Sequence, residues 1–233
     1  MRAFWTGFEK RADEKEDDSS ALSLGAGLLS PAAGLPFTAG AVMAGNRERM
    51  MSPSSVKRFA GNVSSARNID PKIMHTKPHF IASVYNPVTN EIELSGRSPP
   101  SIAAHELGHA SSVGKLWNKG KLPGKAATMA MALGKASTFL PGLALATGTE
   151  TGEKIAPYAG LIGAAPQIIE EMSATGRGLR DLKRFGPKGS LLRAVPTLGL
   201  ALGSYVAPPA ISGYVTKKII DARKRNAAER KPV

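Results

Sequence analysis

The segment His105-Glu106-Leu107-Gly108-His109 places two imidazoles four residues apart, with a carboxylate next to the first of them. Residues four apart lie on one face of an α-helix, so both imidazoles can bind one metal ion while Glu106 points toward the open coordination position. Zinc activates water for attack on a peptide carbonyl, and a neighbouring carboxylate can accept the proton. The spacing therefore predicts a helix that carries zinc ligands at His105 and His109 and a general base at Glu106.

The chain contains no cysteine, so any transition metal must be held by histidine and carboxylate. Its 31 lysine and arginine residues outnumber 18 acidic ones and give a formal net charge of +13. Such a surface attracts anionic lipid or nucleic acid. No recognisable nucleic-acid-binding module accompanies the basic residues, so we expect an anionic membrane as the partner and not nucleic acid.

Charged and uncharged stretches alternate along the chain and suggest its organisation. We expect a charged N-terminal tail at 1–19, an apolar segment at 20–46, a core at 47–193 containing an apolar helical hairpin at 126–169, an apolar helix at 194–216 and a basic tail at 217–233. Prolines interrupt both outer apolar stretches, which favours a re-entrant hairpin at 20–46 over one straight span. A water-soluble bundle rich in alanine and glycine is the alternative.

Local signals place the motif between short elements. Residues 80–95 alternate in a way that predicts two short strands around a turn. Ser52 and Pro53 begin a predicted helix at 52–62, and Pro99 and Pro100 precede the helix that starts at Ser101.

A catalytic zinc ion needs a third protein ligand besides the two histidines. His75 and His79 are candidates if the loop expected before the strands folds back over the site. Glu170 and Glu171 are the alternatives, since they end an uncharged run where a carboxylate pair would otherwise be costly.

Three motifs in order carry a resemblance to a known family. Tyr85-Asn86-Pro87 leads into a strand that ends at Leu94-Ser95, then Ala103-Ala104-His105-Glu106-Leu107-Gly108-His109-Ala110 follows, and Glu171-Met172-Ser173-Ala174-Thr175 lies downstream. This arrangement over residues 70–180 resembles the YugP-like bacterial membrane zinc metallopeptidases and, more distantly, other gluzincin proteases. The chain departs from the family pattern by Thr175 and Gly178, where the family favours serine and alanine.

The resemblance implies that Glu171 is the third zinc ligand, with Ala174 allowing close helix packing and the Thr175 hydroxyl contacting the site. It also implies that the strand before the zinc helix is an edge strand that pairs with an extended substrate. The substrate-binding residues would then be Glu91, Ile92, Glu93, Leu94 and Ser95.

We therefore expect a mainly α fold with a small β-hairpin, an α+β zincin-like catalytic core, and membrane-associated helices or hairpins. The expected function is that of a zinc-dependent metalloendopeptidase acting on polypeptides at a membrane. The positive-inside rule would place the basic regions at 47–58, 177–193 and 217–231, and with them the active site, in the cytoplasm. The rival hypotheses are a membrane-active or structural assembly protein with a vestigial zinc motif, and a basic nucleic-acid-binding protein.

Overall fold

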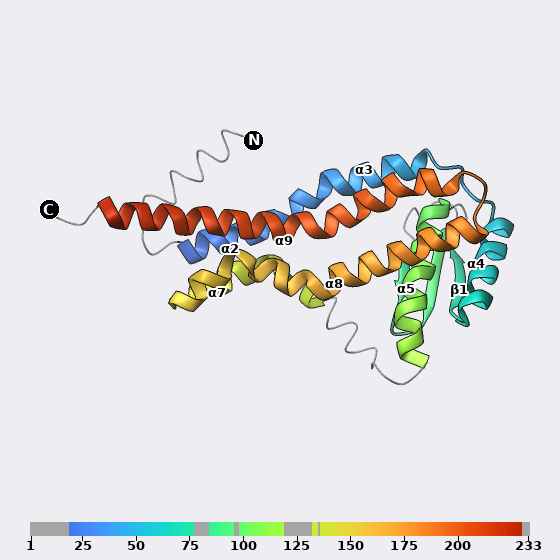
Figure 1. Cartoon of the computed structure of the whole chain (residues 1–233), viewed down its shortest axis with the longest axis horizontal. Coiled ribbons are helices and arrows are strands. Elements are labelled where there is room, and N and C mark those ends of the chain that lie inside the picture. Colours follow the sequence, from blue (N-terminus) through green and yellow to red (C-terminus); the bar gives the residue numbers. More distant parts are fainter. Residues whose placement is uncertain (1–18, 77–83, 96–97, 119–131, 135, 230–233) are drawn as a thin grey trace. The chain divides into compact units, whose positions relative to one another are not determined.

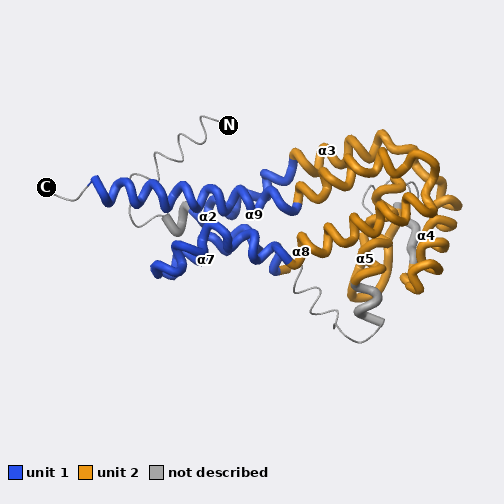
Figure 2. The backbone as a smooth tube through the Cα atoms, in the orientation of Figure 1, with its two compact units in different colours: residues 1–35, 133–165, 205–233 blue, residues 36–132, 166–204 orange. Residues whose placement is uncertain are grey.

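The computed structural model of the protein describes residues 19–76, 84–95, 98–118, 132–134 and 136–229 (Figure 1). These residues are mainly helical and include one small sheet, which confirms the expected fold class at this level. The chain divides into two compact units (Figure 2). Unit 1 comprises residues 1–35, 133–165 and 205–233, and unit 2 comprises residues 36–132 and 166–204.

The sheet belongs to unit 2 and has three strands in the order β1-β3-β2. These strands are β1 (Lys72–Thr76), β2 (Val84–Asn86) and β3 (Glu91–Ser95). β1 runs parallel to β3, and β2 runs antiparallel to it. The sequence did not predict β1, because the segment that holds it was interpreted as basic and polar without a strand pattern.

The central position of β3 corrects one expectation. Glu91, Ile92 and Glu93 are paired with β1 on one side and with β2 on the other, so this part of β3 is not an edge strand. The main chain of Glu91–Glu93 is therefore not open to pairing with a substrate, while Leu94 and Ser95 pair with β1 on one side. His75 is also placed differently from the expectation, because it lies in β1 and not in a loop.

A tight turn joins β2 to β3. The side chain of Asn86 accepts hydrogen bonds from the amides of Val88 and Thr89, and Asn90 adopts a positive φ of 55°, a conformation that asparagine tolerates well. This confirms the predicted turn between two strands for the described part of the segment. Residues 80–83, also included in the predicted first strand, lie outside the described residues.

Helix α4 (Pro53–Arg67) begins where the sequence predicts, at Ser52 and Pro53. The Ser52 hydroxyl accepts a hydrogen bond from the amide of Ser55, and Asn68 ends the helix in the left-handed conformation. The helix is longer than the predicted 52–62, because Val56, Phe59 and Val63 continue an apolar stripe that is buried in the core.

Helix α5 (Pro100–Asn118) packs on the sheet and against α4 within unit 2 (Figure 1). Its buried face contributes Ala103, Ala104, Leu107 and Ala110 to the core. That core also includes side chains of the sheet and of the neighbouring helices, among them Ile92, Leu94, Leu182 and Leu198.

The second half of helix α8 (Glu150–Phe185) lies directly on α5. A Cβ atom placed on Gly108 of α5 would be 2.2 Å from the carbonyl oxygen of Ala174 in α8. A Cβ atom on Gly178 of α8 would be 2.8 Å from the carbonyl oxygen of Ala104 in α5. The two backbones therefore touch in an antiparallel arrangement that only small residues allow.

Unit 1 is helical. It contains α2 (Ser19–Leu29), the 3₁₀ turn η2 (Ser30–Gly34), η3 (Ser137–Phe139), α7 (Leu140–Ala146), residues 150–165 of α8 and residues 205–229 of α9 (Ser190–Glu229). Its helices make polar contacts through small side chains: Ser23 bonds Thr216 over 2.6 Å, and the Ser212 hydroxyl donates to the carbonyl oxygen of Thr138 over 2.6 Å.

Two apolar segments are more continuous than the sequence suggested. Between α2 and α3 (Leu35–Asn46) the backbone stays in the right-handed helical region at both Leu29 and Leu35, so the predicted hairpin turn at 20–46 is absent. Helix α9 (Ser190–Glu229) continues through Pro208 and Pro209 and absorbs the described part of the predicted basic tail.

Both continuous segments have the length and composition of membrane spans. The helical stretches Gly25–Asn46 and Ser190–Glu229 are apolar enough to cross a bilayer, and only 22% of the most apolar window of each is buried. Because α9 has no break, a membrane crossed by its apolar part would separate the basic regions 177–193 and 217–231. The expectation that both are cytoplasmic is therefore incompatible with a spanning α9.

Candidate metal centre

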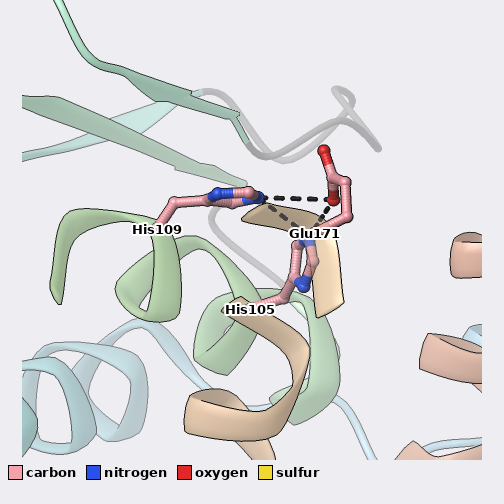
Figure 3. A group of neighbouring side chains, drawn as sticks. All are labelled: His105, His109 and Glu171. Atoms are coloured by element: carbon pink, nitrogen blue, oxygen red, sulfur yellow. Dashed lines mark hydrogen bonds and ion pairs between the residues drawn. The ribbon is translucent and has the colours of Figure 1, made fainter. Parts of the chain in front are cut away.

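His105 and His109 lie one turn apart on α5, on the face that looks toward α8 (Figure 3). Glu171 of α8 points at both rings and is 8% exposed. The Nε2 atom of His105 lies 3.1 Å from Oε2 of Glu171 and 3.1 Å from Nε2 of His109. The Nε2 atom of His109 lies 3.4 Å from the same Glu171 oxygen. Three potential ligand atoms from two helices thus form a nearly equilateral triangle.

The size of this triangle fits zinc. In a tetrahedral site with bonds of about 2.0–2.1 Å, neighbouring ligand atoms are about 3.3 Å apart. The observed edges of 3.1, 3.1 and 3.4 Å are close to that value. Two imidazoles and one carboxylate are also a donor set of catalytic zinc, which keeps a fourth position open. Among the described residues, this is the group of histidines and carboxylates placed to hold a metal ion.

The second nitrogen of each ring has a hydrogen-bond partner from α8. Nδ1 of His105 lies 3.2 Å from the Thr175 hydroxyl, which confirms the contact expected for that threonine. Nδ1 of His109 lies 3.1 Å from Oε1 of Glu170, and the same oxygen accepts a hydrogen bond from the Ser112 hydroxyl. Such partners fix the ring orientation and the tautomer that presents Nε2 to a metal.

The carboxylates strongly affect the charge state of His109. Burial opposes its imidazolium form, but hydrogen bonds to Glu170 and Glu171, together with the negative charges of Glu171 and Glu106, outweigh burial and raise the His109 pKa to about 10. For Glu171, burial favours the neutral acid, but hydrogen bonds from His105 and His109 outweigh it and lower the pKa to about 2. Glu171 is therefore ionised over the whole physiological range.

Glu106 follows His105 and is 8% exposed. Burial raises its pKa above the usual range, while the charges of His105 and His109 and a hydrogen bond from the backbone amide of Tyr85 partly offset this. A carboxylate whose pKa is shifted toward neutrality beside a metal site is suited to exchange protons during catalysis.

The Tyr85 amide shows which strand borders the site. Because this amide donates to Glu106 of α5, the edge of β2 that does not pair with β3 faces α5. The Tyr85 hydroxyl donates to Oδ1 of Asn90 over 3.1 Å, and burial, with a smaller effect of Glu170, raises its pKa to about 12.

The structure brings together most of the residues that the sequence singled out. His105, His109 and Glu171 converge and Glu106 lies beside them, whereas the central strand β3 supplies no free main-chain edge at Glu91–Glu93. His79 lies outside the described residues.

The sequence did not predict the contacts of Glu170 and Ser112 with each other and with His109. Glu170 was expected to point aside, because consecutive helical residues differ by about 100° in direction. It reaches the outer nitrogen of His109 because that ring lies between the two carboxylates. Ser112 follows His109 by three residues and so lies on the same face of α5, which is the signal that could have identified it.

Comparison with protein-family models, curated proteins and solved structures gives no match.

Proposed function

We propose that this protein is a zinc-dependent metalloendopeptidase with a zincin-like core. The observation that carries the proposal is the triangle of His105, His109 and Glu171, whose edges suit a tetrahedral zinc ion, with the buried carboxylate of Glu106 beside it. The resemblance of its three motifs to YugP-like peptidases agrees with this assignment.

Each residue has a defined role in this proposal. His105, His109 and Glu171 hold the metal, while Thr175 and Glu170 orient the two rings. Zinc supplies the Lewis acidity that makes water nucleophilic near neutral pH and polarises a carbonyl. Glu106 accepts the proton from the attacking water and delivers it to the departing amine, a transfer for which its raised pKa is suited.

The proposed substrate is an extended polypeptide that pairs with β2. Among the described strands, β2 pairs on one side only, and its other edge borders α5 at Glu106, whereas Glu91–Glu93 of β3 are paired on both sides. A substrate strand on β2 would be recognised through main-chain hydrogen bonds, which read side chains weakly and favour broad specificity.

Unit 1 supports location at a membrane, because large apolar side chains are exposed on its surface while hydroxyl side chains share its interior with two small apolar clusters. Hydroxyl side chains are buried between its helices, while large apolar side chains face outward, as expected where lipid surrounds the helices. The buried residues are Ser23, Ser30, Ser137, Thr138, Ser212 and Thr216, and the exposed ones include Leu28, Leu29, Leu143, Tyr158, Ile162 and Tyr214.

The proposed orientation places the active site in the cytoplasm, against a membrane with anionic lipid. All site residues lie within 47–193, between the two candidate spans, and the basic regions 47–58 and 177–193 flank them. The positive-inside rule assigns such flanks to the cytoplasmic side, where anionic headgroups attract them.

The test is the metal content and activity of the purified protein. We expect one zinc per chain, and hydrolysis of a denatured protein substrate that stops with 1,10-phenanthroline and returns with added zinc. Protein that folds but binds no stoichiometric zinc would support the rival hypothesis of an assembly protein with a vestigial motif.

A further inference from the structure

Glu48 is a buried carboxylate outside the metal centre. It lies between α3 and α4, is 5% exposed, and accepts two hydrogen bonds. The amide of Ser101, in the first turn of α5, donates to Oε2 over 3.1 Å, and the hydroxyl of Thr197, in α9, donates to Oε1 over 2.7 Å. No lysine or arginine among the described residues forms an ion pair with it.

The first turn of α5 explains why a carboxylate is stable there. The first amides of a helix have no carbonyl partner within the helix, and the positive end of the helix dipole favours an anion. Pro99 and Pro100 lack N–H groups, so Ser101 supplies the first amide of this helix. Glu48, from a distant part of the chain, accepts the hydrogen bond of this amide. The buried carboxylate in turn keeps two hydrogen-bond donors, the Ser101 amide and the Thr197 hydroxyl, which offset the cost of its burial.

The same contact fixes the turn that precedes the metal ligands. Ser101 is four residues before His105, so the carboxylate holds the helix one turn from the first zinc ligand. At the next turns, Ala104 and Gly108 touch the backbone of α8, which carries Glu171. The rotation and axial position of α5 are thus set at one end by Glu48 and along its length by α8.

We propose that Glu48 is a positioning residue for the metal centre. Through Ser101 and Thr197 it locks the start of the zinc helix to α9, and this sets the rotation at which His105 and His109 face Glu171. This inference rests on the proposed zinc site, but it concerns ligand geometry and not the hydrolytic reaction.

The test uses the full-length protein loaded with Co²⁺, whose visible spectrum reports ligand geometry. Glu48→Ala should shift and weaken the d–d bands and lower zinc affinity about tenfold or more, in the range typical of residues that orient metal ligands. Glu48→Gln should restore most of the spectrum, because its amide oxygen still accepts from Ser101 while its NH₂ group donates to the Thr197 hydroxyl. Thr197→Val, which keeps the volume but removes one hydrogen bond, should produce a smaller change in the same direction.

Val63→Ala is the matched control, since it removes buried volume from the same core on α4 and leaves both hydrogen bonds of Glu48 in place. It should lower the melting temperature and leave the Co²⁺ spectrum unchanged. The proposal is overturned if Glu48→Ala behaves like Val63→Ala, or, where Glu48→Ala does not fold, if Thr197→Val leaves the spectrum and zinc affinity at wild-type values. Failure of the wild-type protein to bind Co²⁺ or zinc would instead refute the proposed metal site itself.

Discussion

Nδ1 of His109 lies 3.1 Å from Oε1 of Glu170, while Nε2 of the same ring lies 3.4 Å from Oε2 of Glu171. Two consecutive carboxylates of α8 thus contact opposite edges of one imidazole. The first, Glu170, can orient the ring, and the second, Glu171, can share a metal ion with it. The sequence predicted a role at the site for Glu171 alone.

Replacing Glu171 and Glu170 separately should separate these tasks. Glu171→Ala removes a ligand and should abolish stoichiometric zinc and activity together. Glu170→Ala should retain zinc with an affinity lower by about 10- to 100-fold, because His109 loses the partner of its Nδ1 atom. Zinc titration with a competing chelator measures both, with Glu150→Ala as control, since that carboxylate is exposed and pairs with Lys154. Equal affinities for Glu170→Ala and the wild type would contradict the orienting role.

Glu106→Gln should separate metal binding from proton transfer. The two histidines and Glu171 remain, so zinc content should be unchanged, whereas the proton acceptor is lost and kcat/KM should fall by about 10²–10⁴-fold or more. Parallel measurement of zinc by mass spectrometry and of peptide hydrolysis checks this. Hydrolysis at the wild-type rate in that variant would eliminate Glu106 as the general base.

Gly108→Ala should disrupt the contact between α5 and α8. Its Cβ atom would be 2.2 Å from the Ala174 carbonyl oxygen, so the helix backbones must move apart, at a cost of about 1–3 kcal/mol and with a loss of zinc affinity. Gly176→Ala is the control, because no atom lies within 4 Å of that Cβ position and alanine favours helix. Thermal unfolding should therefore show opposite shifts for the two variants, and similar shifts would argue against the close contact.

Zinc affinity should rise with pH. In the metal-free protein the His109 pKa is raised from 6.5 to about 10. The imidazolium therefore stabilises the folded, metal-free protein fully below about pH 6.5, and this stabilisation is lost as the pH rises to about 10. Zinc requires the neutral ring, so binding releases this proton, and affinity should increase about tenfold per pH unit between pH 6 and 9. Glu171, with a pKa of about 2, adds no slope there.

Isothermal titration in buffers of different ionisation enthalpy counts the released protons. A pH-independent affinity would mean that His109 is already neutral. Glu170→Gln, which removes one of the three carboxylates that raise the His109 pKa, should make the affinity level off at a lower pH than in the wild type.

Single cysteines should report the topology of α9. Cysteine at Ser54 and cysteine at Lys188, both exposed, should be labelled from the same side as each other. Cysteine at Ala227 should be labelled from the opposite side, because α9 continues without a break from Ser190 to Glu229. The natural chain has no cysteine, so each variant carries one label. Labelling of all three from one side would show that α9 lies along the membrane instead of crossing it.

The sequence by itself determined the features that depend on near neighbours. The spacing of His105 and His109 defines one helix face, Ser52 and Pro53 define a helix start, and Asn86 defines a turn, because each depends on contacts within a few residues.

Only the tertiary structure decided the features that depend on long-range packing. β1 pairs with a strand that begins 15 residues after it ends, which makes β3 central and leaves β2 at the edge beside Glu106. The roles of Glu170 and Glu48 likewise depend on partners 61 and 53 residues away, at His109 and Ser101. No local pattern encodes these contacts, since the packing of whole helices and strands brings the atoms together.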